Sequence, residues 1–204
     1  MLGKFLKQRN LKKLKDSNYE FLFDECESSD EFVVFDTETT GLNPKKDELL
    51  SIGAVKIKGN RILTQEKLYV FTKPECLVDP NSIKIHQLRN VDLEGALDPK
   101  CAIEKFLNFI GPLPLVGYYL EFDVAMIDRY IKPWLGIKLP NKKIEVSGVY
   151  YDKKIKAIPD GFVDLRFDSI MKELSLPIFG KHDAINDAIM TAMMFVKLKN
   201  IDKI

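Results

Sequence analysis

The segment Phe32–Leu42, which reads FVVFDTETTGL, decides how we interpret the rest of the chain. Its apolar opening run is typical of a short strand that is buried on both faces, and the run stops at Asp36. Because strand side chains alternate, Asp36 and Glu38 are expected on the same side of the strand's end. Two carboxylates that close repel each other unless a cation lies between them, and oxygen ligands suit a hard metal ion. The segment therefore predicts half of a metal site, with an acidic turn closed by Gly41 as the alternative interpretation.

Length and composition are those of an ordinary globular chain. With 204 residues it is long enough for one well-packed domain, and its formal net charge of +1 gives no overall basic field for binding a polyanion. The 3 cysteines form no CxxC pair, which favours neither a disulfide framework nor a thiolate zinc site. Neither a membrane-spanning apolar run nor a signal peptide is recognisable. We expect a soluble cytoplasmic protein that does not bind membranes.

The first 29 residues differ in composition from the rest. Basic residues precede any acid, apolar residues recur among them at helical spacing, and acids follow. We therefore expect a basic amphipathic helical extension over residues 1–29, ahead of a main domain over residues 30–204. Its lysines either contact nucleic acid or a partner, or face water on a helix that packs on the domain; the second interpretation is favoured because charge runs are usually solvated.

The order of strand and helix patterns indicates an α/β protein. After the opening strand the sequence predicts strands over residues 49–57 and 61–71, joined by a turn at 58–60, which form an antiparallel meander. Strand and helix patterns then alternate: a helical turn at 82–88, a helix at 103–110, a strand at 113–117, and helices at 122–134 and 163–174, before a last apolar helix near the C-terminus. Residues 136–162 are expected to be a loop or a small hairpin.

Two further acids lie on otherwise apolar helices. Asp123 is in line with the apolar positions of its helix. Asp128 lies on a different face of the same helix and is expected on the surface. Asp187 lies in the last helix, and His182 precedes it by too many residues to share its face, so His182 must lie in the loop that enters the helix. His86 is compatible with either a structural or a substrate-binding role.

Together these residues resemble the DEDDh group of the DnaQ-like 3′–5′ exonucleases, which includes the epsilon subunit of bacterial DNA polymerase III and RNase T. Residues 36–42 match the first motif, Phe122–Asp123 the second and His182–Asp187 the third, and the resemblance covers about residues 31–200. It implies a ribonuclease H-like fold, in which a mixed five-stranded sheet, an antiparallel meander followed by strand–helix alternation, is flanked by helices.

The resemblance also implies a function, namely metal-dependent 3′–5′ exonuclease activity that releases nucleoside 5′-monophosphates from a single-stranded or frayed 3′ end. Two Mg²⁺ or Mn²⁺ ions would be held by four acids, Asp36, Glu38, Asp123 and Asp187, and His182 would be the general base. The terminal nucleotide would contact five residues, Thr37, Thr39, Leu42, His86 and Phe122.

One departure from the family pattern concerns substrate positioning. The family often has His-Asn before the Phe-Asp pair, and this chain has Tyr118-Tyr119. DNA is favoured over RNA as the substrate; an RNA-directed exoribonuclease, a non-catalytic nucleic-acid-binding or replicase-associated module, and a ribonuclease H or integrase-type endonuclease are the alternatives.

Partners are less clearly indicated than chemistry. Residues 173–179, which read ELSLPIF, resemble a peptide that docks on bacterial sliding clamps, although a helix end followed by a proline turn explains the same residues. A DNA polymerase and a sliding clamp are therefore named as possible partners, and the oligomeric state does not follow from the sequence.

Overall fold

A mixed sheet of five strands forms the centre of the computed structural model, which describes residues 2–26, 30–156 and 161–202, and only the backbone of residues 2–6. Its strand order is β3-β2-β1-β4-β5. The strands are β1 (Glu31–Thr39), β2 (Leu49–Lys58), β3 (Arg61–Phe71), β4 (Leu115–Gly117) and β5 (Lys143–Glu145). The first three are antiparallel, whereas β4 runs parallel to β1, and β5 runs parallel to β4. The predicted meander and the mixed sheet are therefore confirmed.

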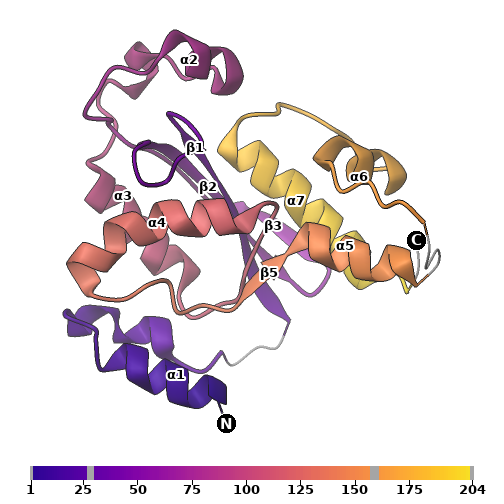
Figure 1. Cartoon of the computed structure of the whole chain (residues 1–204), viewed down its shortest axis with the longest axis horizontal. Helices are drawn as coiled ribbons and strands as arrows, with labels where there is room; N and C mark the ends of the chain where they lie inside the picture. Colours follow the sequence, from indigo (N-terminus) through magenta and orange to yellow (C-terminus); the bar gives the residue numbers. More distant parts are fainter. Residues whose placement is uncertain (1, 27–29, 157–160, 203–204) are drawn as a thin grey trace.

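Strand β1 is central because its side chains are apolar on both faces. Val33 and Phe35 belong to one hydrophobic core, and Val34 belongs to another on the opposite face. Helices α3 (Pro99–Ile110) and α4 (Leu120–Leu135) contribute to the first core. Helices α5 (Val146–Ile155), α6 (Phe167–Glu173) and α7 (Ala184–Lys199) contribute to the second (Figure 1). The end of β1 thus opens between two helical layers.

The N-terminal end of α7 lies unusually close to the sheet. A Cβ atom on Gly53 of β2 would lie 2.2 Å from the carbonyl carbon of Ala184, so only glycine permits this approach. On the neighbouring strand, the hydroxyl of Tyr69 donates to Oδ2 of Asp183 at 2.7 Å. These two contacts hold the first turn of α7 beside the end of β1.

The expectation for residues 136–162 was wrong, because the segment contains β5 and α5 rather than a loop or hairpin. Strand β5 is only 3 residues long and pairs in parallel with β4, so no local hairpin signal exists for it. Within α5, Val146 and Tyr150 are buried in the second core. Residues 157–160 lie outside the described residues.

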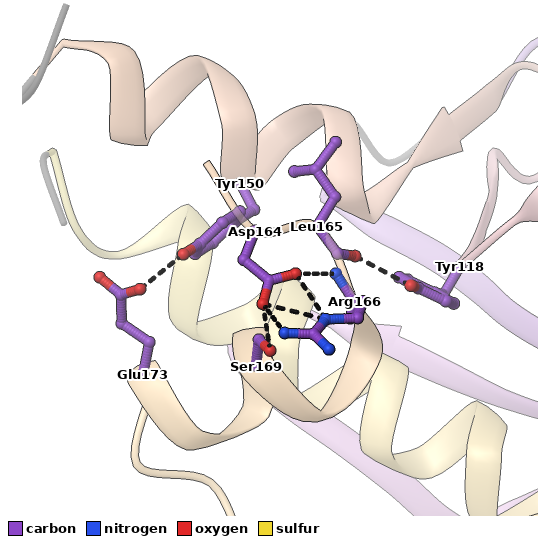
Figure 2. A network of polar contacts seen from close by, with 7 residues as sticks. All are labelled: Tyr118, Tyr150, Asp164, Leu165, Arg166, Ser169 and Glu173. Atoms are coloured by element: carbon purple, nitrogen blue, oxygen red, sulfur yellow. Dashed lines mark hydrogen bonds and ion pairs between the residues drawn. The ribbon is translucent and has the colours of Figure 1, made fainter. Parts of the chain in front are cut away.

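The helix predicted over 163–174 is shorter than expected. It begins at Phe167, because Asp164 accepts hydrogen bonds from the side chains of Arg166 and Ser169 and holds the preceding residues in a turn (Figure 2). The expectation of a surface Asp128 was also wrong. Its side chain is buried, and Oδ1 accepts a hydrogen bond of 2.8 Å from the backbone N–H of Leu139.

At the N-terminus, helix α1 (Leu2–Leu11) is followed by a short 3-10 helix, η1 (Ser17–Phe23). Tyr19 of η1 is buried and packs edge-on against Trp134 of α4, with ring centroids 5.0 Å apart. Residues 27–29 and Met1 of the expected extension lie outside the described residues, and the boundary at residue 30 stays a proposal. In the described part of the chain, no helix has the length and apolarity that a membrane span requires.

Candidate active site

Three carboxylates meet at the end of β1. Asp36 and Glu38 come from the strand, and Asp187 comes from the first turn of α7. One oxygen of each lies within 4.8 Å of the others, which is close enough for all three to bind a single ion. The strand's alternation brings Asp36 and Glu38 to the same side, as predicted. The approach of α7 at Gly53 supplies the third acid.

The fourth predicted acid, Asp123, lies beside this cluster and is fixed by Thr37. Its Oδ1 atom accepts hydrogen bonds from the backbone N–H of Thr37 at 2.9 Å and from the Thr37 hydroxyl at 2.6 Å. The carboxylate is nearly fully buried, with 4% of the residue exposed. Burial raises the pKa of Asp123 to about 7, although the hydrogen bonds from Thr37 oppose that rise. Thr37, predicted to contact substrate, therefore places its hydroxyl on an acid of the site.

The acids of the site do not ionise independently. Burial, followed by the charges of its acidic neighbours, raises the pKa of Asp36 well above its usual range. The same causes, with Asp187 as the strongest neighbour, raise the pKa of Glu38 to about 8. Burial also raises the pKa of Asp187 to about 6. A divalent cation would offset this repulsion, and a donor set made of carboxylate oxygens suits Mg²⁺ or Mn²⁺.

His182 lies in the loop that enters α7, as its spacing from Asp187 requires. Its backbone is left-handed, with φ of 61°, and its N–H donates to Oδ2 of Asp187 at 2.9 Å. The imidazole is exposed. The next residue, Asp183, caps α7 by accepting a hydrogen bond from the N–H of Asn186 at 3.1 Å. The cap and the left-handed turn together leave the His182 side chain outside the helix.

A cavity of about 210 Å³ opens beside these acids. Its lining comes from β1, α6, α7, the residue after β4 and the loop before α7, and consists of Asp36, Tyr118, Phe167, Lys181, His182, Asp187 and Thr191. The motifs did not identify Phe167, Lys181 or Thr191. Lys181 is next to His182 in the sequence, and its ammonium lies 2.8 Å from both carboxylate oxygens of Asp168. Only that adjacency was a signal for it.

Tyr118 occupies a wall of this cavity where the family often has histidine. Its ring packs edge-on against Phe167, with centroids 5.1 Å apart. Its hydroxyl donates to the carbonyl of Leu165 at 2.9 Å, as Figure 2 shows. Tyr118 thus joins the end of β4 to the start of α6.

The other residues predicted to contact substrate have different surroundings. Leu42 is 88% exposed, in the loop after β1, whereas the Thr39 hydroxyl donates to the carbonyl of Gly41 at 2.7 Å. Phe122 is half-buried against the first core. His86 ends helix α2 (Pro80–His86) and is buried, and its Nδ1 atom accepts from the N–H of Leu88 at 3.1 Å.

The second ring nitrogen of His86, Nε2, has no hydrogen-bond partner among the described residues. Burial lowers the pKa of His86, and the nearby His182 lowers it further. The two histidines are therefore near enough for their charges to interact.

Comparison with known proteins agrees with the geometry. The Exonuclease family model, RNase_T, matches residues 33–195. A DNA polymerase III subunit epsilon of Aquifex aeolicus is 28% identical over 167 residues, which are 82% of this chain and 79% of that protein. A PolC-type DNA polymerase III of Thermotoga maritima is 30% identical over 175 residues, and the match covers 84% of this chain and 12% of the polymerase. This chain thus corresponds to a small part of the PolC-type polymerase.

Solved structures of exonuclease I share the fold. The match to one of them covers 84% of this chain and 41% of the exonuclease I chain, with a TM-score of 0.70 and 17% sequence identity. The E. coli enzyme in complex with a dT13 oligonucleotide gives a TM-score of 0.67. This likeness confirms the ribonuclease H-like fold. The family match over residues 33–195 shows that the chain belongs to the exonuclease family, and its named relatives and its three motifs are those of the DnaQ-like group.

Proposed function

We propose that this exonuclease hydrolyses the last phosphodiester bond at the 3′ end of single-stranded or frayed DNA and releases a nucleoside 5′-monophosphate. The observation that carries the proposal is the cluster of Asp36, Glu38 and Asp187, whose oxygens lie within 4.8 Å of one another and whose pKa values are all raised. Such a cluster costs folding free energy unless a cation neutralises it, and functional sites are where such costs are found.

The four acids would hold two Mg²⁺ or Mn²⁺ ions. Asp36, Glu38 and Asp187 would bind the first ion, and Asp36 and Asp123 the second. When bound, the ions would lower the pKa of the attacking water and stabilise charge on the leaving oxygen. The hydrogen bonds from Thr37 favour the ionised form of Asp123, which is the form that binds metal.

We assign the proton transfer to His182. Its exposed imidazole, on the loop before α7, would accept a proton from the attacking water. The water oxygen forms a bond to phosphorus, the bond from phosphorus to the 3′ oxygen of the shortened strand breaks, and that oxygen takes up a proton from solvent. The hydrogen bond between the His182 N–H and Asp187 would keep the loop next to the acids.

The terminal nucleotide would lie between Leu42, His86 and Phe122. An exposed Leu42 offers an apolar surface for a base of any identity, and the unpartnered Nε2 of His86 offers one hydrogen bond. Thr37 and Thr39 would act by shaping the site, because their hydroxyls are bonded to Asp123 and Gly41.

The names of the relatives and of the similar structures lead us to propose DNA as the polymer and a DNA polymerase as a partner. The Aquifex relative is a subunit of DNA polymerase III, and the E. coli exonuclease I structure contains a DNA oligonucleotide. A sliding clamp is less well supported. In the segment 173–179, Leu174 is buried and only the far end, which includes Ile178 and Phe179, offers exposed large apolar side chains.

A time course on labelled substrates tests the function. Purified protein with Mg²⁺ or Mn²⁺ is expected to shorten 5′-labelled single-stranded DNA one nucleotide at a time, with RNA, mismatched duplex DNA and a circular single strand compared in parallel. Asp187→Ala is expected to abolish the reaction. Intact linear DNA under conditions in which a reference exonuclease degrades it would refute the proposal, and cleavage of the circle would indicate an endonuclease.

A further inference from the structure

A second, larger cavity lies along the outward side of α4. Its volume is about 800 Å³, and it shares no lining residue with the cavity at the acids. Three parts of the chain form it: the loop after β1 at Pro44 and Lys45, α4 itself from Leu120 to Lys132, and residues 138–145, which include β5. Nothing in the mechanism above uses this cavity.

Its lining is rich in cations. Five basic side chains line it, namely Lys45, Arg129, Lys132, Lys138 and Lys143, against three acids, Glu121, Asp128 and Glu145. Because the whole chain has a formal net charge of only +1, this excess is a local feature. Within the part of the chain that the structure describes, the ammonium groups of Lys45 and Lys132 make no hydrogen bond and no ion pair, so both are free to bind an anion.

Two of the three acids are already engaged. Asp128 accepts from the N–H of Leu139 at 2.8 Å and lies 3.9 Å from the ammonium of Lys138. Glu145 accepts from the N–H of Leu120 at 2.9 Å and so caps α4. Glu121 is exposed and is the remaining acid on the lining. With five cations against three acids, the lining has an excess of two positive charges.

One end of the cavity lies at the first turn of α4, which also carries Asp123, although the lining residues occupy a different face of the helix from that acid. Leu120, Glu121 and Val124 line it from the same turns of α4 that carry Asp123. Glu145 is close enough that its charge contributes to the raised pKa of Asp123. From Glu121 the lining continues along the helix to Lys132, a distance of about 16 Å at 1.5 Å per residue. A ligand bound here would extend away from the site along α4.

We propose that this cavity binds the sugar-phosphate backbone of the DNA strand on the 5′ side of the scissile bond. The inference rests on the proposed function and extends it to upstream nucleotides. Lys45 and Lys132 would neutralise phosphates, and the apolar side chains of Pro44, Leu120 and Val124 would contact sugars. Phosphates carry the same charge at every nucleotide, so binding through them is independent of sequence.

The test compares substrates of two lengths. The variant Lys45→Ala/Lys132→Ala and the matched control Lys67→Ala/Lys105→Ala, which removes two exposed lysines outside the cavity, are assayed on a 20-nucleotide strand and on a dinucleotide. For the cavity variant, KM for the long strand is expected to rise about tenfold. The slope of log binding constant against log salt should become shallower by about 1.4, since each single-strand phosphate contact contributes about 0.7. KM for the dinucleotide should change less than twofold.

Equal changes on both substrates, or a cavity variant that behaves like the control, would overturn the inference. Binding of a fluorescent 20-nucleotide strand to Asp187→Ala protein, with and without the two cavity substitutions, separates this failure from failure of the proposed function. Weaker binding in the cavity variant supports the inference even if no protein cleaves DNA, and unchanged binding refutes it even if all of them do.

Discussion

The hydroxyl of Thr37 donates a hydrogen bond of 2.6 Å to Oδ1 of Asp123 and thereby joins the end of β1 to the first turn of α4. The same oxygen accepts from the Thr37 backbone N–H at 2.9 Å. Both bonds favour the ionised carboxylate and oppose the effect of its burial on the pKa. Thr37 is therefore a positioning residue for a proposed metal ligand.

Thr37→Val should raise the pKa of Asp123 above its present value of about 7, because the ionised form loses one donor. The acid limb of the pH profile of kcat/KM is expected to move to higher pH, and half-maximal activity should require more Mg²⁺. Thr64→Val, at an exposed position of β3, is the matched control and should leave both unchanged. A pH profile identical to that of the unsubstituted protein would show that the Thr37 hydroxyl does not influence Asp123.

The raised pKa values predict how stability depends on pH in the absence of metal. The pKa of Glu38 rises from 4.5 to about 8 on folding, so between these values the folded protein binds more protons than the unfolded chain. The contribution of Glu38 to stability should therefore be fully present below pH 4.5 and fall as the pH rises towards 8. Thermal unfolding in EDTA across this range measures the effect, and saturating Mg²⁺ at pH 8 should recover the lost stability. An unfolding temperature that rises steadily from pH 5 to pH 8 in EDTA would contradict it.

Removing one charge from the cluster should increase the stability of the metal-free protein and decrease its activity. Glu38→Gln is expected to raise the unfolding temperature of metal-free protein at pH 8, by about 2–4 °C per kcal/mol of relieved repulsion, and to lower kcat at least 100-fold. Glu66→Gln, at an exposed position on β3, should change neither quantity. A Glu38→Gln protein that is less stable than the unsubstituted one would show that Glu38 is not under repulsive strain.

The four acids that we propose as metal ligands could be singled out in the sequence because each has a local signature. Asp36 and Glu38 follow an apolar strand on the same side, and Asp123 and Asp187 lie in otherwise apolar helices, and the family resemblance then brings the four together. The bond from Thr37 to Asp123 was not predictable, because it depends on how two elements 86 residues apart pack against each other.

Non-local packing also explains the errors. Strand β5 has the sequence Lys-Ile-Glu, and it forms a strand only because it pairs in parallel with β4. Asp128 is buried because the chain turns after α4 and brings the N–H of Leu139 to its carboxylate. No periodicity within either segment contains that information.

The close packing of Gly53 against α7 predicts a severe effect of adding one carbon atom. In Gly53→Ala, the new Cβ would lie 2.2 Å from backbone atoms of Ala184, so the start of α7 must move. We expect a loss of about 1–3 kcal/mol in the free energy of unfolding and a weakened affinity for Mg²⁺, because Asp187 moves with the helix. Gly148→Ala is the control, since a Cβ there has no heavy atom within 4 Å. Urea unfolding and Mg²⁺ titration measure both, and unchanged Mg²⁺ affinity in a folded Gly53→Ala protein would be the contrary outcome.

Tyr118 should affect catalysis through the position of α6 rather than by touching the reacting atoms. Tyr118→Phe keeps the ring contact with Phe167 but removes the hydrogen bond of 2.9 Å to Leu165, at a cost of about 0.5–1.5 kcal/mol in stability. Since Tyr118 and Phe167 line the cavity with His182, KM is expected to rise several-fold with little change in kcat. Tyr118→His, which restores the residue common in the family, should bring KM closer to the original value than Tyr118→Ala does. Tyr151→Phe, on the exposed side of α5, is the control. A fall in kcat at constant KM would instead place the Tyr118 hydroxyl in the chemical step.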